Sequence, residues 1–204
     1  PPFRVCLRPQ FQNAPGFLVT LFQIATEPSI PMHQRQAASI YMKHHVRKNW
    51  KLPPSPDADP PAKPHKERYS AQDKQFVLNN LVERLVSTPA QGGIREQLLV
   101  TLAHVAWVEF PHNWPELVPK SMALLASGQS EQASVGLRVI IVLLRNFTFC
   151  ALERKKEFFR QQLQLSNVVL PTALQLFQML RQYTHAESAE MQHLLLKVFW
   201  YSIE

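Results

Sequence analysis

The chain has 204 residues, 46% of them hydrophobic and 18% charged, so it is long and apolar enough to bury a substantial core. Its formal net charge is +7, and its two cysteines, Cys6 and Cys150, are too few for a disulfide framework and too far apart for a CxxC metal site. Only 5 glycines against 17 prolines argue against glycine-rich phosphate loops and favour helices broken by proline, so the composition predicts an all-α protein.

The first two predicted helices lie within residues 15–28 and 34–50, where apolar residues recur three and four positions apart. The first is expected to bury Leu18, Leu21, Phe22 and Ile24. The second is expected to bury Ala38, Tyr41, Met42, Val46 and Trp50. Lys43, Arg47 and Lys51 are spaced four apart on the second helix and repel one another, so its apolar side must hold it in place.

A proline-rich segment over residues 52–69 interrupts this pattern and predicts an extended loop, because proline lacks the backbone N–H that regular structure requires. Helical periodicity returns over residues 70–89, with Ser70 or Ser87 as a candidate cap, and again over 92–110. Further helices are predicted within residues 114–127, 131–147, 168–183 and 188–203, with a polar stretch reaching to about Arg160 before the third of these. Pro171 is expected either in the first turn of its helix or at a kink.

The predicted helices recur as similar pairs. Arg35 and Arg95 are 60 residues apart, and removing the roughly 18-residue proline-rich loop leaves about 42, within the range of two-helix HEAT repeats. The predicted fold is therefore a right-handed α-solenoid of HEAT repeats, built from antiparallel helix pairs. A compact helical bundle is the alternative. The expected boundaries are 8–27 for the end of repeat 1, 33–88 for repeat 2, 93–128 for repeat 3, 131–184 for repeat 4 and 187–204 for the first helix of repeat 5.

Neither the histidines nor the tryptophans of the sequence indicate a catalytic, metal or cofactor site. His44 and His45 are adjacent and point about 100° apart on a helix, so they cannot hold one ion from one face. HExxH, GxSxG, GxGxxG and GxxxxGK[ST] patterns do not occur. The four tryptophans are expected to seal contacts between helices; they are Trp50, Trp107, Trp114 and Trp200. We expect no enzyme activity and no cofactor.

Three ordered segments resemble nuclear transport receptors of the importin-β type. Residues 35–50, RQAASIYMKHHVRKNW, resemble the RQxAxxYLKNxIxxxW segment of the second repeat, and residues 94–119 resemble the third repeat, in which an IRxQL helix precedes a D[FY]PxxWPxLV turn. Residues 15–25 resemble the end of the first repeat. The matching signature residues include Arg35, Gln36, Ala37, Tyr41, Lys43, Trp50, Arg95, Gln97, Pro111, Trp114 and Pro115. The proline-rich insertion and the late LLLKVFWYSI further resemble the branch that contains importins seven and eight.

This resemblance implies a receptor that shuttles between cytoplasm and nucleus, carries protein cargo past the nucleoporins and releases it on binding Ran-GTP. In this family the inner helices of the first repeats bind Ran, which implies a surface on the polar sides of residues 17–26, 71–87 and 115–127. The best candidates for Ran contact are Lys74, Asn79, Asn80, Glu83 and Lys120. A basic cargo is expected to bind acidic repeats C-terminal to this chain.

Two other functions stay open from the sequence. The charge of +7 and the pI near 9.7 meet the rough threshold for a helical repeat that binds nucleic acid, although the packing role of the basic helix makes this the weaker interpretation. The other alternative is a passive scaffold whose surface binds some other protein. The sequence contains no apolar run of the roughly 18 residues needed to span a bilayer, so membrane insertion is not expected.

Overall fold

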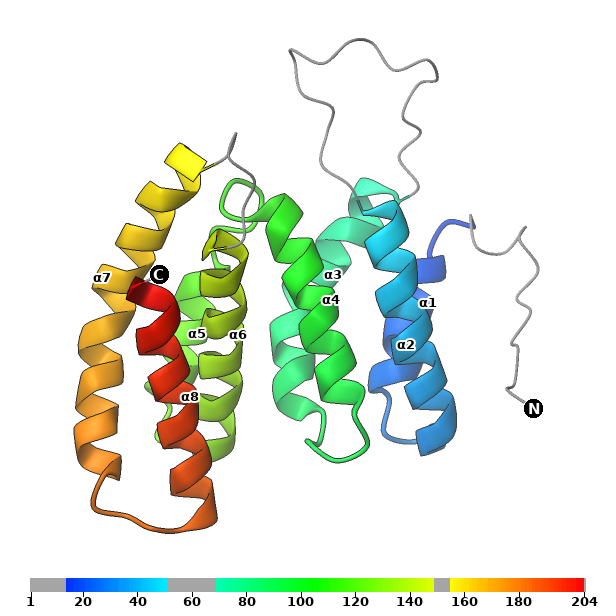
Figure 1. The fold of residues 1–204 in the computed structure, drawn as a ribbon. Helices are drawn as coiled ribbons and strands as arrows, with labels where there is room; N and C mark the ends of the chain where they lie inside the picture. Colours follow the sequence, from blue (N-terminus) through cyan, green and yellow to red (C-terminus); the bar gives the residue numbers. More distant parts are fainter. Residues whose placement is uncertain (1–13, 51–68, 149–154, 204) are drawn as a thin grey trace. The chain divides into compact units, whose positions relative to one another are not determined.

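The computed structural model describes residues 14–50, 69–148 and 155–203, so the predicted proline-rich loop lies outside the described residues except for Tyr69. Within these ranges every regular element is a helix. The helices are α1 (Phe17–Thr26), α2 (Met32–Asn49), α3 (Ala71–Ser87), α4 (Ile94–Glu109), α5 (Leu117–Leu125), α6 (Ser130–Thr148), α7 (Lys155–Leu180) and α8 (Ala186–Ile203). The chain divides into two compact units, Pro1–His104 and Val105–Glu204. Consecutive helices within each unit run in opposite directions (Figure 1).

In the first unit, α1 packs against both α2 and α3. The apolar side chains that the sequence spaces three and four apart form the contact, and Phe22 of α1 meets Phe76 of α3 edge to face at 6.0 Å between ring centroids. The side chains of Met42, Val46 and Trp50 from α2 are fully buried. The side of α3 opposite its buried residues is exposed to solvent.

In the second unit, α6 packs against α5, α7 and α8, and α7 packs against α8. Gly136 permits the close approach of α6 to α5, since a Cβ at this position would lie 2.7 Å from the Ser121 carbonyl oxygen. Arg138 of α6 and Glu190 of α8 form an ion pair of 2.6 Å. The Gln192 side chain of α8 donates a hydrogen bond of 2.8 Å to the Leu180 carbonyl at the end of α7, which satisfies a backbone acceptor that the helix leaves unpaired.

The prediction for the start of α7 is wrong. This helix begins at Lys155 and includes residues that were expected in an irregular polar stretch, and Pro171 lies inside the helix rather than in its first turn. A proline there lacks the N–H that would donate to the carbonyl of Asn167, and its ring crowds that carbonyl. Pro171 and Asn167 are both exposed residues, and the helix continues through the proline.

Several side-chain predictions also need correction. Trp50 and Trp114 are buried and Trp107 is half-buried, but Trp200 is 58% exposed and seals no contact among the described helices. On α1, Ala25 rather than Ile24 completes the buried stripe, because α2 and α3 contact that helix from two directions and shift its buried side. On α2, Tyr41 is half-buried.

Candidate functional site

The polar side of α3 carries four of the five candidate Ran contacts. Gln75, Asn79 and Glu83 follow one another at intervals of four residues and are all exposed, so they form one solvent-facing row. Lys74 and Asn80 lie beside this row and are half-buried. The row, with these two flanking residues, is called the α3 polar face below. It combines amide, carboxylate and ammonium groups, which suit a polar contact with another protein.

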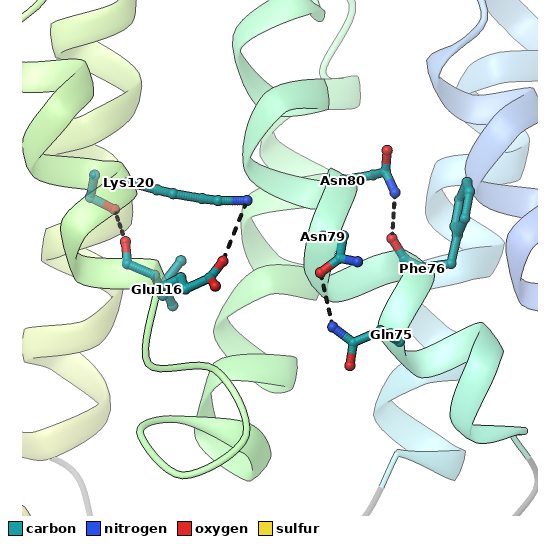
Figure 2. A network of polar contacts seen from close by, with 8 residues as sticks. Gln75, Phe76, Asn79, Asn80, Glu116 and Lys120 are labelled. Atoms are coloured by element: carbon teal, nitrogen blue, oxygen red, sulfur yellow. Dashed lines mark hydrogen bonds and ion pairs between the residues drawn. The ribbon is translucent and has the colours of Figure 1, made fainter.

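Local contacts hold the side chains of this face in place. The Gln75 side-chain nitrogen donates to the Asn79 side-chain oxygen at 2.9 Å, and the Asn80 side-chain nitrogen donates to the Phe76 carbonyl at 2.8 Å (Figure 2). The ammonium nitrogen of Lys74 lies 5.9 Å from the centre of the Trp50 ring, a distance at which a cation is attracted to the ring face. These contacts connect side chains of the face to neighbouring groups of the first unit.

The position of α3 itself depends on residues that are not among the candidate Ran contacts. The Ser70 side chain accepts a hydrogen bond from the Asp73 backbone N–H at 3.0 Å and so caps the helix, as expected. The Asp73 carboxylate then accepts from the Gly16 N–H at 3.2 Å, which ties the start of α3 to the start of α1. Buried His45 Nδ1 and the Tyr69 hydroxyl share a hydrogen bond of 2.6 Å. The serine and aspartate three positions apart were a detectable signal, whereas the partners Gly16 and His45 were not.

The fifth candidate, Lys120, lies on α5 in the second unit. Its ammonium nitrogen is 4.0 Å from a carboxylate oxygen of Glu116, one helical turn earlier (Figure 2). Both side chains are partly exposed, so an incoming acidic group can compete for the lysine at little cost.

The family signature contains two arginines that make the same contact in successive helix pairs. Arg35, in the first turn of α2, donates through Nε to the Ala25 carbonyl near the end of α1 at 3.2 Å. Arg95, in the first turn of α4, donates through Nε to the Thr88 carbonyl after α3 at 2.8 Å, and its Nη2 donates to the same oxygen. Each arginine therefore satisfies a carbonyl that the preceding helix leaves without a donor.

Two more signature residues join elements of the first unit. The Gln36 side chain donates to the Gly92 carbonyl at 2.8 Å, which connects α2 to the turn before α4. Buried Trp50 accepts a hydrogen bond at its carbonyl from His104 Nε2 at 3.2 Å. Burial lowers the pKa of His104, and the nearby Arg47 charge lowers it further, while the hydrogen bond to Trp50 acts in the opposite direction.

The remaining signature residues differ in their surroundings. Tyr41 packs edge to face on Phe17 with ring centroids 6.0 Å apart, and its burial raises the pKa of its hydroxyl. Ala37 is exposed and Lys43 is half-buried, so neither is a core residue.

In the turn before α5, Trp114 is buried, Pro115 is exposed, and Pro111 follows Phe110 through a cis peptide bond. On α4, half-buried Gln97 has a buried side-chain oxygen without a hydrogen-bond partner among the described residues. The signature thus serves packing and helix termination more than direct binding.

Residues 14–50, 69–148 and 155–203 contain no cluster of three or more histidine, cysteine or acidic side chains that could hold a metal ion. No helix in this part of the chain is both long enough and apolar enough to cross a membrane.

Comparison with known proteins shows what this chain is similar to. Residues 7–87, which include α1, α2 and α3, match the importin-beta N-terminal domain. Over this stretch the resemblance to importin-β-type receptors that the sequence predicted is confirmed. It is 25% identical to a probable importin-7 homolog from Dictyostelium discoideum over 195 residues, which is 95% of this chain and 17% of that protein. It is 28% identical to importin-8 from Homo sapiens over 188 residues, which is 91% of this chain and 17% of that protein.

A solved structure supports the fold independently. The exportin Cse1 in its cargo-free, cytoplasmic state superposes with a TM-score of 0.73 at 15% identity, covering 95% of this chain and 20% of the exportin chain. The predicted resemblance to importin-β-type receptors, including importins seven and eight, and the predicted all-α solenoid fold are therefore confirmed. The chain spans 17% of the length of these importin relatives, so the activity of a whole receptor does not follow from the match alone.

Proposed function

We propose that this chain is the Ran-GTP-binding part of a nuclear import receptor, which carries protein cargo past the nucleoporins and releases it when Ran-GTP binds. The observation that carries the proposal is that the α3 polar face lies inside the stretch that matches the importin-beta N-terminal domain. In this account Lys74, Asn79, Asn80 and Glu83 contact Ran, and Lys120 adds a contact from α5. Cargo binds repeats that follow this chain, and the receptor shuttles between cytoplasm and nucleus.

The proposed mechanism is a coupling between two binding events. If Ran-GTP and cargo favour different arrangements of the receptor, each lowers the affinity of the other by the same factor. Contacts from preorganised side chains suit this role, because less side-chain freedom is lost on binding. The hydrogen bonds of Asn79 and Asn80 to neighbouring groups of α3 supply that preorganisation.

The repeat boundaries are part of the same proposal: α2 with α3, α4 with α5, and α6 with α7 form repeats 2 to 4, while α1 ends repeat 1 and α8 begins repeat 5. The equivalent contacts of Arg35 and Arg95 support the equivalence of α2 and α4 as first helices of their repeats.

A direct test measures binding of Ran-GTP and Ran-GDP to the full-length receptor by calorimetry. The proposal expects Ran-GTP to bind and Ran-GDP not to bind. Equal affinity for the two forms, or binding of neither, would contradict it.

The substitution Glu83→Arg tests the location of the surface. Reversing the charge of this exposed side chain is expected to weaken Ran-GTP binding about tenfold, because an attractive polar contact becomes repulsive. The matched control is Glu187→Arg, which makes the same charge change at an exposed position of α8 and should leave Ran affinity unchanged. An unaltered affinity for Glu83→Arg would place Glu83 outside the interface.

A further inference from the structure

The exposed side of α2 carries apolar and polar residues in its first half and basic residues toward its end. In the first half the exposed residues are Met32, His33, Gln34, Ala37 and Ile40. His44, Arg47 and Lys48 are exposed in the last two turns, and Lys43 beside them is half-buried. These nine residues are called the α2 exposed face. The 18 residues of α2 include no aspartate or glutamate, so nothing on the helix itself offsets this charge.

The lysine and arginine side chains of this face have no acidic partner within the described part of the chain. Within residues 14–50, 69–148 and 155–203, the side chains of Lys43, Arg47 and Lys48 form no ion pair. Lysine and arginine near a helix C-terminus are favoured by the helix dipole, which accounts for Arg47 and Lys48 in the last turn. The dipole does not account for Lys43 or for the absence of acidic residues, because Lys43 lies before that turn and repels Arg47 at a spacing of four.

The positive field extends beyond α2 to the neighbouring helices of the first unit. The Arg47 charge lowers the pKa of His104 on α4, and the Lys74 ammonium of α3 lies over the Trp50 ring just after α2. Cationic groups from two helices, Arg47 of α2 and Lys74 of α3, therefore lie near the end of α2. A region of one charge sign attracts ligands of the opposite sign and raises their association rate.

Exposed Ile40 and the packing of the nearby aromatic residues indicate the class of ligand. Single-stranded nucleic acid is bound through exposed aromatic side chains on which bases stack. On and just after α2 the aromatic residues are committed to packing, because Tyr41 is half-buried against Phe17 and Trp50 is fully buried. Exposed Ile40 instead offers a contact for an apolar side chain. The face therefore fits an acidic polypeptide better than a nucleic acid.

We propose that the α2 exposed face binds an acidic protein segment that contains an apolar residue, at a surface separate from the α3 polar face. Ile40 and Arg47 are seven residues apart, which corresponds to about 11 Å along a helix. An extended peptide rises about 3.3 Å per residue, so its acidic residues should begin about three positions from its apolar residue. The apolar residue contacts Ile40 and the acidic residues contact Arg47, Lys48 and His44.

The test is fluorescence anisotropy with the full chain and a labelled synthetic peptide of about twelve residues, which carries one leucine and a run of glutamates starting three positions later. The variant Arg47→Glu/Lys48→Glu is expected to weaken binding at least tenfold, as is typical of losing and reversing two exposed charge contacts. The control Arg181→Glu/Lys197→Glu makes the same charge change at exposed positions of the second unit and should change binding less than twofold.

Three further measurements keep the proposal open to refutation. Arg47→Gln/Lys48→Gln should also weaken binding, and because it adds no negative charge at the helix end, it covers the case in which the reversal variant fails to fold. Ile40→Ser should weaken binding of the leucine peptide but not of a peptide with glycine in place of leucine. Glutamine in place of the peptide glutamates should abolish binding. An equal loss of peptide affinity in the Arg181→Glu/Lys197→Glu control would overturn the proposal. Tighter binding of oligouridylate RNA than of the peptide would also overturn it.

Discussion

The two equivalent arginines of α2 and α4 should contribute unequally to stability. Arg95 makes two hydrogen bonds to the Thr88 carbonyl, one from Nε and one from Nη2. Arg35 makes one, from Nε to the Ala25 carbonyl, and its buried Nη2 has no partner among the described residues. Both side chains are buried and both lie in the first unit, so the same unfolding transition reports both.

The expected magnitudes follow from these contacts. A hydrogen bond with a charged donor contributes about 1.5 to 3 kcal/mol, and removing it also leaves a buried acceptor unpaired. Replacing arginine by methionine keeps most of the apolar stem but removes the charge and its desolvation cost. Arg95→Met should therefore lower the free energy of unfolding by about 2 to 3 kcal/mol. Arg35→Met should lower it by about 1 kcal/mol, because loss of a single, longer bond is partly offset by removal of an unsatisfied buried nitrogen.

Urea denaturation followed by circular dichroism measures both values, with Arg181→Met at an exposed position as the control that should stay within about 0.5 kcal/mol of the unmodified chain. Equal destabilisation by the two variants, or a larger effect of Arg35→Met, would refute the assignment of energy to satisfied hydrogen bonds.

Two other residues give separate predictions. Gly136→Ala should destabilise the second unit by about 1 to 2 kcal/mol despite the better helix propensity of alanine, because the new Cβ would lie 2.7 Å from the Ser121 carbonyl oxygen. A midpoint temperature of thermal unfolding that is unchanged or higher would contradict this. Burial lowers the pKa of His104 in the folded chain. Below about pH 6.5 the unfolded chain therefore binds more protons than the folded chain, and the stability that neutral His104 provides is lost as the pH falls. His104→Gln should flatten this pH dependence of the unfolding free energy, and NMR titration of Arg47→Gln should show a higher pKa for His104. An unchanged pKa in Arg47→Gln would exclude the proposed influence of the arginine charge.

The helices and their apolar sides could be predicted because helical periodicity is a local property of the sequence. Leu18, Leu21 and Phe22 are buried as expected from their spacing. The prediction was wrong where the pattern is ambiguous. The first turns of α7 are polar enough to look like a loop, and Pro171 looks like a helix boundary although the helix continues through it.

Contacts between residues that are distant in sequence could not be predicted from periodicity. The row of Gln75, Asn79 and Glu83 could be predicted as one polar side, since all three lie on one helix. The link from Asp73 to Gly16 spans 57 residues, so no local pattern indicates it. Trp200 was expected to be buried because large rings usually are, but its burial requires an apolar neighbour that the described helices do not provide.

The most direct test of the central claim is amide hydrogen exchange of the full-length receptor with Ran-GTP and, separately, with Ran-GDP. The account predicts that Ran-GTP slows exchange in α1, α3 and α5, at residues 17–26, 71–87 and 117–125, while α2 is unchanged and Ran-GDP has no effect. Protection confined to α2, or the same protection by both nucleotide forms of Ran, would contradict it.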